Sequence, residues 1–308
     1  MVSAELSGGK PARTIDAAAL SHINARMQAA AQAPWLHAEA GRRMAQRLPV
    51  IRLQPARVLD WWSFSGGSAD VLLKAYPKTE LLRLEPAPHR SPSTDPTPPR
   101  PVPWWSVQRW RDAKPASMTE TDVQPGSVEL VWANMGLHRW VDPQRALQCW
   151  QRALAVDGFL MFSTLGPGSL SMLQSIYARA GWPPPFAPFV DMHDLGDMLV
   201  GAGFADPVMD QELLTLTWPD AQAALNELRQ LGGNAHPARG QGLRTRRWRD
   251  DLLGALAEQA GPNGRVALTF ELVYGHAFKA LPRARVAPTT HVAVEDLRRM
   301  AQSGRPTR

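Results

Sequence analysis

Residues 56–86 read ARVLDWWSFSGGSADVLLKAYPKTELLRLEP and predict a β-strand, a loop, a helix and a second β-strand, in that order. The first strand contains Val58 and Leu59 side by side, and consecutive apolar residues are typical of a central parallel strand that is buried on both faces. In the helical segment, Val71 and Leu72 share one apolar face. A strand–helix–strand unit of this length, with small residues before the helix, indicates a doubly wound α/β sheet.

The segments on both sides of this unit continue the α/β pattern. Before it, apolar residues at three- and four-residue spacing predict helix over 16–47, and Pro34 is expected to divide that helix into two. In the predicted strands 209–218 and 265–279, apolar and polar residues alternate, which indicates an antiparallel pair at the edge of the sheet. After the first unit, the sequence predicts strands at 127–137, 158–165, 209–218 and 265–279 and helices at 142–154, 168–181 and 192–204.

Residues 16–280 are expected to form one domain that contains two unusual segments. Residues 86–103 include eight prolines in eighteen positions, which predicts an extended surface loop. Residues 218–262, before the last strand, combine helical periodicity with many arginines and predict a basic helical insertion. The small and polar ends of the chain, residues 1–15 and 281–308, are expected to be a disordered N-terminus and a flexible C-terminal tail.

The composition excludes several classes of protein. Of the 308 residues, 44% are hydrophobic and 20% are charged, as in globular proteins, so a wholly disordered or fibrous chain is excluded. No apolar run approaches the roughly 18 residues of a membrane span, and the first residues lack a signal-peptide core, so no membrane partner is expected. The single cysteine, Cys149, excludes a disulfide framework, is expected to serve in packing, and favours a cytoplasmic location.

Positive charge is concentrated towards the C-terminus. The net charge is +6, whereas residues 229–308 alone contain 14 Lys and Arg against six Asp and Glu. Only five of the 34 basic residues are lysines, and the planar guanidinium of arginine suits carboxylates and phosphates. The excess therefore predicts either an anionic partner or a solvated, arginine-rich surface. No groove-binding module or aromatic RNA-binding motif accompanies it, so no nucleic-acid partner is expected.

Candidate site residues gather where the first two predicted strands end, because open α/β sheets bind ligands at the carboxyl ends of their strands. Gly66 and Gly67 let the backbone come close to a ligand, and amides at the start of the next helix can receive an anion. Glu85 ends the second strand, where an acidic side chain can bind the two hydroxyls of a ribose. The alternative is a tight turn followed by a solvent-exposed glutamate.

Two segments, VLDWWSFSGG (58–67) and YPKTELLRLEP (76–86), are similar to the first two motifs of the class I S-adenosylmethionine-dependent methyltransferases. From about Trp35 to Lys279, the chain more specifically resembles the malonyl-acyl carrier protein O-methyltransferases of biotin synthesis, above all in FSTLGPGSL (162–170) and DMHDLGDMLVGAGF (191–204). This resemblance implies a Rossmann-like fold, S-adenosyl-L-methionine as cofactor, and methylation of the free carboxylate of malonyl carried on an acyl carrier protein.

The resemblance also implies roles for individual residues. The glycines would hold the methionine moiety of the cofactor and Glu85 its ribose, while Asp60 would tie down the loop. Asn134 and His138 would lie at the floor of the methyl-transfer pocket and are the candidate catalytic residues; for His138 the alternative is a histidine packed near Trp140. The residues assigned to cofactor binding are Asp60, Gly66, Gly67, Glu85 and Asn134.

Two departures from the family pattern concern the cofactor site. Trp62 and Phe64 stand where the family usually has glycines, so their side chains either remodel the turn or occupy the methionine pocket. The acidic residue that contacts adenine in the family would fall near Ser117, where this sequence has no carboxylate in register.

These departures leave open two other functions: a binding or assembly factor with weak or no cofactor binding, and a class I methyltransferase with a different substrate. Indoles that could stack on adenine or simply fill the core are those of Trp61, Trp62, Trp104, Trp105 and Trp110.

The malonyl carboxylate is ionised at neutral pH and is itself the nucleophile, so no general base is expected. A cationic group must hold that carboxylate, and the arginines of the basic insertion are the candidates; they could instead dock the acidic carrier protein. Helical spacing would place 239, 246 and 249 on one face. The residues assigned to substrate or carrier binding are Arg239, Arg244, Arg246, Arg247 and Arg249.

The cluster of acidic and histidine side chains at 191–197 is interpreted as a helix start rather than a metal site. Asp191 is a natural N-cap, and Asp194 would lie in the first turn, where a negative charge complements the helix dipole. No metal is therefore expected.

Overall fold

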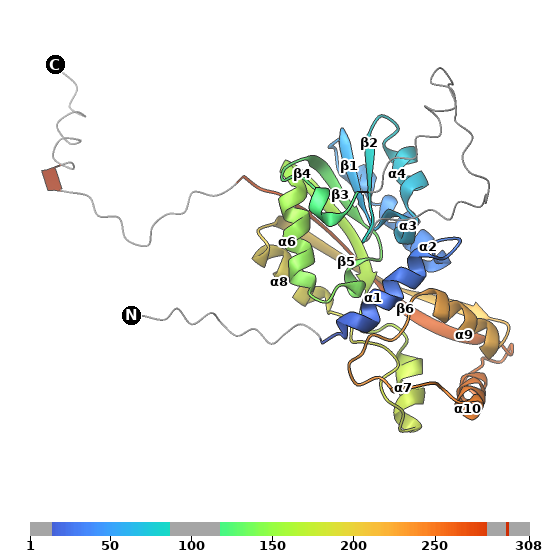
Figure 1. Ribbon diagram of the computed structural model, residues 1–308. Coiled ribbons are helices and arrows are strands. Elements are labelled where there is room, and N and C mark those ends of the chain that lie inside the picture. Colours follow the sequence, from blue (N-terminus) through green and yellow to red (C-terminus); the bar gives the residue numbers. More distant parts are fainter. Residues whose placement is uncertain (1–13, 87–117, 282–293, 296–308) are drawn as a thin grey trace, which may run out of the picture.

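The structure is a computed structural model that describes residues 14–86, 118–281 and 294–295 (Figure 1). Most of the expected proline-rich loop, the N-terminal segment and the C-terminal tail lie outside these residues, as do Trp104, Trp105 and Trp110. Within them, the expected α/β domain is present as one central sheet with helices on both faces (Figure 1).

The sheet has six strands in the order β2-β1-β3-β4-β6-β5. The first four are parallel to one another, whereas β6 is antiparallel to both β4 and β5. This confirms a mostly parallel sheet with an antiparallel pair at its edge. The strand that runs in the opposite direction is β6, which lies between β4 and the edge strand β5. The strands are β1 (Arg57–Trp61), β2 (Glu80–Leu84), β3 (Val128–Ala133), β4 (Leu154–Leu165), β5 (Ala205–Trp218) and β6 (Val266–Phe278).

The helices of the described residues cover both faces of the sheet, which is why the central strands are apolar on both sides. Helices α6 and α8 pack on one face through Trp150 and Leu195, and α2 and α4 pack on the other through Met44 and Leu72 (Figure 1). Helices α7, α9 and α10 continue that second layer over β5 and β6. The helices are α1 (Ala17–Gln28), α2 (Trp35–Ala45), α3 (Ser63–Gly66), α4 (Ala69–Ala75), α6 (Pro143–Ala153), α7 (Ser171–Arg179), α8 (Met192–Gly201), α9 (Ala221–Gln230) and α10 (Arg246–Ala257), with short 3-10 turns at Leu48–Val50, Glu120–Asp122 and Leu137–Arg139.

Helix boundaries follow the sequence signals. Pro34 is the N-cap of α2, so it separates α1 from α2 as expected. Asp142 caps α6 with Pro143 in its first turn. Asp191 accepts a hydrogen bond from the His193 amide at 2.8 Å, which confirms it as the N-cap of α8.

Among the described residues there is no group of three or more His, Cys, Asp or Glu side chains that could hold a metal ion, and no helix long and apolar enough to cross a membrane.

The basic insertion is helical, as expected, and contains two helices, α9 and α10, but one arginine does not lie where the helical spacing predicted. Arg239 precedes α10 in a non-helical segment, so it does not share a helix face with Arg246 and Arg249. Its guanidinium forms an ion pair of 2.6 Å with Asp16, the N-cap of α1. The prediction of one continuous helical face from 239 to 249 was wrong because Gly240 and Gly242 interrupt the helix.

Candidate functional site

The segment after β1 is a tight helical turn rather than an open loop. Trp62 adopts the left-handed backbone conformation (φ 57°, ψ 49°), α3 follows it, and Gly67 (φ 64°) leads into α4. A side chain in the left-handed region costs about 1–2 kcal/mol, which is the reason that glycine is usual at such a position. Trp62 therefore holds this conformation at the expense of strain, and contacts around its indole must compensate.

Those contacts form a stack at the carboxyl ends of β1 and β3. The indole of Trp62 is buried and lies parallel to that of Trp140, with ring centroids 5.6 Å apart and planes inclined by 8°. The guanidinium carbon of Arg139 lies 4.9 Å from the centroid of the Trp62 ring, within the range of a cation–π interaction. Of the five tryptophans in the expected group, Trp61 is also buried, in the core beneath the stack.

Asp60 and Glu85 are both buried beside this turn. The Asp60 carboxylate accepts a hydrogen bond of 2.5 Å from the Ser63 hydroxyl, and burial, followed by the nearby charge of Glu85, raises the pKa of Asp60 to about 7. Glu85 accepts a hydrogen bond of 2.7 Å from the Phe64 amide in α3. The structure thus brings two expected site residues together and joins the end of β2 to the turn after β1.

The side chain of Asn134, the residue after β3, forms hydrogen bonds to residues of α2, α3 and β4. Its side-chain amide donates to the carbonyl oxygens of His37 at 2.7 Å and Gly66 at 2.6 Å, and its carbonyl accepts from the Ser163 hydroxyl at 2.6 Å. Both amide hydrogens are therefore used within the protein. Gly66 fits against this side chain, since an added Cβ would lie 3.6 Å from the Cβ of Asn134.

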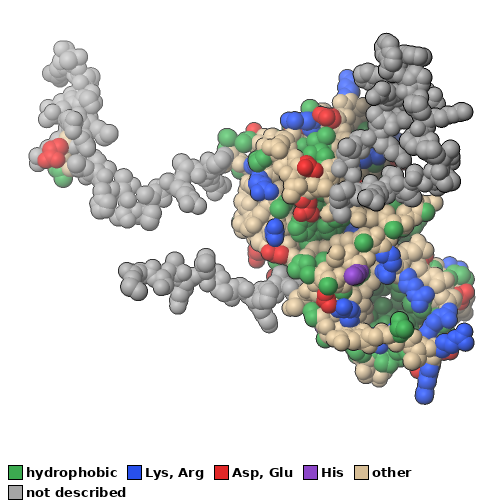
Figure 2. Space-filling view, viewed as in Figure 1, with side chains coloured by type: hydrophobic (Ala, Val, Ile, Leu, Met, Phe, Trp, Pro, Cys, Tyr) green, Lys and Arg blue, Asp and Glu red, His purple; other side chains and the backbone are tan. Residues whose placement is uncertain are grey.

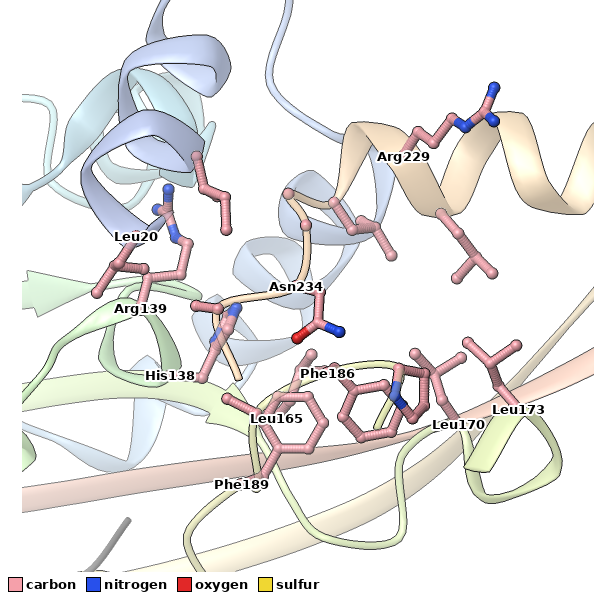
Figure 3. A pocket seen from close by; sticks show the side chains of 18 of the residues that line it. Leu20, His138, Arg139, Leu165, Leu170, Leu173, Phe186, Phe189, Arg229 and Asn234 are labelled. Carbon is pink, nitrogen blue, oxygen red and sulfur yellow. The ribbon is translucent and has the colours of Figure 1, made fainter. Parts of the chain in front are cut away.

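A cavity of about 310 Å³ lies beyond His138 and Arg139, under α1, α9 and the segment after α7 (Figure 3). Leu165, Phe186 and Phe189 form apolar walls, and the Asn234 side chain projects between them in Figure 3. The residues expected in cofactor binding, Asp60, Gly66, Gly67, Glu85 and Asn134, do not line this cavity. The arrangement places a mostly apolar cavity beside the cluster at the strand ends.

His138 belongs to the wall of this cavity. Its imidazole packs edge to face against His37 and Phe189, with centroids 6.3 Å and 6.0 Å away. The Nδ1 atom of His138 lies 3.5 Å from the hydroxyl of Thr164. His138 thus lines the cavity and packs against the rings of His37 and Phe189.

Glu271, which the sequence did not single out, shapes the other wall. Its carboxylate accepts from the Gly168 amide at 2.5 Å, and its carbonyl accepts from the Gly166 amide at 2.9 Å. A Cβ on Gly166 would lie 2.6 Å from the Glu271 carboxyl carbon, so both glycines of this segment permit a close approach. The signal for it was an acidic residue in the middle of a mostly apolar strand. It fixes the segment that carries Leu165 and Leu170 into the cavity.

The other four arginines assigned to substrate or carrier binding lie on the surface and do not line the cavity. Arg244 lies over the ring of Trp248, and Arg249 donates to Gln222 at 2.5 Å. Arg246 and Arg247 occupy the first turn of α10. In Figure 2, basic side chains gather at the end of the molecule formed by α9 and α10.

No protein-family model matches the chain. Several curated proteins named malonyl-[acyl-carrier protein] O-methyltransferase are similar to it over most of their length. The protein of this name from Laribacter hongkongensis is 37% identical over 261 residues, which are 82% of this chain and 86% of that protein. The protein from Gallionella capsiferriformans is 35% identical (80% and 85%), and that from Methylovorus sp. is 34% identical (83% and 85%).

Among solved structures, the YcgJ protein from Bacillus subtilis is similar over 78% of this chain and 98% of its own, with 10% identity and a TM-score of 0.49. The identities to the curated proteins, each extending over four fifths of the chain or more, agree with the resemblance seen in residues 35–279. The chain belongs to the malonyl-[acyl-carrier protein] O-methyltransferase family.

Proposed function

We propose that this chain transfers a methyl group from S-adenosyl-L-methionine to the free carboxylate of malonyl carried on an acyl carrier protein, a step of biotin synthesis. The observation that carries the proposal is the family relationship, combined with a buried carboxylate, Glu85, at the ligand-binding edge of the sheet. The proposed location is the cytoplasm, which the single cysteine supports.

The chemistry of the residues fits the cofactor in its nucleoside part. Glu85 provides a carboxylate at the end of β2, where ribose hydroxyls can donate to it. The cofactor supplies a methyl group on a positively charged sulfonium centre. The chain must then orient the malonyl carboxylate and exclude water, because that carboxylate is already the nucleophile.

Calorimetric titration tests the proposal in two steps. First, S-adenosyl-L-methionine and its demethylated product are titrated into the protein. Second, methyl transfer is measured on malonyl-acyl carrier protein, with acetyl-acyl carrier protein as the control that lacks the acceptor carboxylate. Binding together with malonyl-dependent transfer is expected. Binding without transfer would indicate a different methyl acceptor.

The second candidate function is that of a binding or assembly factor that does not bind the cofactor. Trp62 favours it, because a buried indole stands at a position where the family usually has glycine. Absence of calorimetric binding for both forms of the cofactor, in a protein that unfolds cooperatively, would support this function and exclude methyl transfer.

Replacing Glu85 by alanine or glutamine should weaken cofactor binding about tenfold to a hundredfold. The reason is that an ionised acceptor of two ribose hydroxyls would be lost, at a cost of roughly 1.5–3 kcal/mol. Glutamine keeps a carbonyl that can accept from the Phe64 amide, so Glu85→Gln separates loss of the charge from disturbance of the turn. Calorimetry with the demethylated cofactor measures the effect, and equal affinity in both variants and the unmodified protein would remove Glu85 from the site.

The carrier protein would dock on the surface around the start of α10. Arg244, Arg246 and Arg247 are exposed there, and Leu243 beside them is fully exposed at 101%. A basic surface that also exposes an apolar side chain is complementary to an acidic partner that also has apolar groups. Arg239 contributes less to this surface because it is paired with Asp16.

Charge reversal of Arg246 and Arg247 to glutamate should raise the KM for the carrier-bound substrate roughly tenfold at low salt, and the penalty should shrink as salt rises. Glutamate is favourable in the first turn of a helix, so α10 should remain folded. Steady-state kinetics with malonyl-acyl carrier protein and with free malonyl-pantetheine measure the effect. The double variant Arg52→Glu/Arg152→Glu, with the same change of charge on other exposed elements, is the control. Equal penalties for both substrates would place carrier docking elsewhere.

A further inference from the structure

Arg139 is a cation buried without an ion-pair partner among the described residues. Its side chain is only 4% exposed, yet its guanidinium donates to neutral groups: the Ser65 hydroxyl at 2.7 Å, the Asn24 side-chain carbonyl at 3.4 Å and the Met27 sulfur at 3.3 Å. Within the part of the chain that the structure describes, its Nε atom has no hydrogen-bond partner. Burial lowers the pKa of Arg139 to about 10, although the charge of Glu85 opposes this shift. The group remains charged at neutral pH.

A buried charge of this kind is costly unless an opposite charge accompanies it. The described surroundings of Arg139 do not provide one within ion-pair distance. His37, which is fully buried and donates from Nδ1 to the Ser65 carbonyl at 2.6 Å, has its pKa lowered to about 3 by burial and then by the charge of Arg139. His37 is therefore neutral, and the local excess of positive charge is that of Arg139.

Arg139 also belongs to the lining of the 310 Å³ cavity, at the end nearest the turn after β1 (Figure 3). Opposite it, Leu165, Phe186 and Phe189 make the space apolar. Two other guanidinium groups line the cavity, those of Arg26 and Arg229, but both side chains are exposed, and Arg229 points outward in Figure 3. Arg139 is thus the buried cation at the inner end of an apolar space.

We propose that this cavity binds the acyl group of the substrate and that Arg139 holds its free carboxylate. The inference rests on the proposed function, and it moves the carboxylate anchor from the surface arginines of the insertion to the inner wall of the cavity. A guanidinium is suited to the role because its planar fork matches a carboxylate. Because Arg139 also donates to Ser65 in α3, a carboxylate bound to it lies next to the turn that follows β1.

Direct binding of two thioesters tests this assignment without methyl transfer. Malonyl-pantetheine and acetyl-pantetheine differ by the carboxylate alone, so their affinities for the full chain, measured by calorimetry, isolate its contribution. The unmodified protein should prefer the malonyl compound. Arg139→Gln should weaken malonyl binding about tenfold to a hundredfold while acetyl binding stays the same, which also shows that the variant is folded. Arg139→Lys should retain part of the preference, since it keeps the charge but not the fork.

The matched control is Arg179→Gln, which removes an exposed arginine at the end of α7 and should leave both affinities unchanged. A parallel titration with the demethylated cofactor distinguishes the two possible sources of a carboxylate. If Arg139→Gln weakens only cofactor binding, Arg139 holds the amino-acid carboxylate of the cofactor and the inference is wrong. It is equally overturned if the unmodified protein does not prefer malonyl over acetyl. If the protein binds malonyl-pantetheine more tightly than acetyl-pantetheine but transfers no methyl group to any carrier-bound substrate, the proposed function is contradicted and this binding site is retained.

Discussion

Replacing Asn134 by alanine should lower the free energy of unfolding by about 3–5 kcal/mol, because the change removes one hydrogen bond from each of three buried polar groups. The carbonyl oxygens of His37 and Gly66 each lose a donor, and the Ser163 hydroxyl loses its acceptor. An unsatisfied buried group costs about 1–3 kcal/mol, and water is excluded here because Asn134 is 0% exposed. Denaturant unfolding with a two-state analysis measures the loss.

The control is Asn226→Ala in α9, where the side chain is exposed and bonds to Gln222 on the same helix. That change should stay within about 0.5 kcal/mol. If Asn134→Ala instead keeps its stability and loses methyl transfer, Asn134 acts on the substrate or cofactor, and its hydrogen bonds to His37 and Gly66 are secondary. The measurement therefore separates a residue that holds the site together from one that takes part in the reaction.

Local signals were enough to predict the elements of the fold. The strand–helix–strand unit of 56–86, the division of the first helix at Pro34 and the cap at Asp191 each depend on neighbours within a few residues, and each is present in the structure. The antiparallel pair β5–β6 followed from strict alternation in both segments. The sequence did not predict that β6, rather than β5, lies next to β4, because the alternation of apolar and polar residues does not indicate the order of strands in a sheet.

The candidate site was less predictable, because its residues meet across the sheet. The three partners of Asn134 come from three separate segments of the chain, and the sequence gives no sign of their distance from it. Arg139 was overlooked for a related reason: the many arginines of 239–249 are conspicuous in the sequence, whereas the significance of Arg139 lies in its burial. A run of arginines in the sequence predicts a positively charged surface. Only the packed structure shows which charge is buried and therefore costs free energy of desolvation.

Trp62→Gly should lower the free energy of unfolding by about 1–4 kcal/mol. Loss of a buried tryptophan costs about 3–5 kcal/mol, and release of the left-handed strain returns about 1–2 kcal/mol. Trp62→Ala removes nearly the same side chain but keeps a Cβ at φ 57°, so we expect it to be about 1 kcal/mol less stable than the glycine variant. This pair of variants separates the strain in the turn from the packing of the indole against Trp140 and Arg139.

The same variants decide how the chain departs from its family at this turn. If the indole occupies the methionine pocket, Trp62→Gly should raise the affinity for the demethylated cofactor despite the lower stability, and adding Phe64→Gly should raise it further. Trp62→Ala should show most of the gain, because the indole and not the Cβ would fill the pocket. Calorimetry at a temperature where all variants are folded provides the comparison. Flat or reduced affinity would mean that the indole lies outside the pocket and that the stack of Trp62, Trp140 and Arg139 supports the turn on which the cofactor rests.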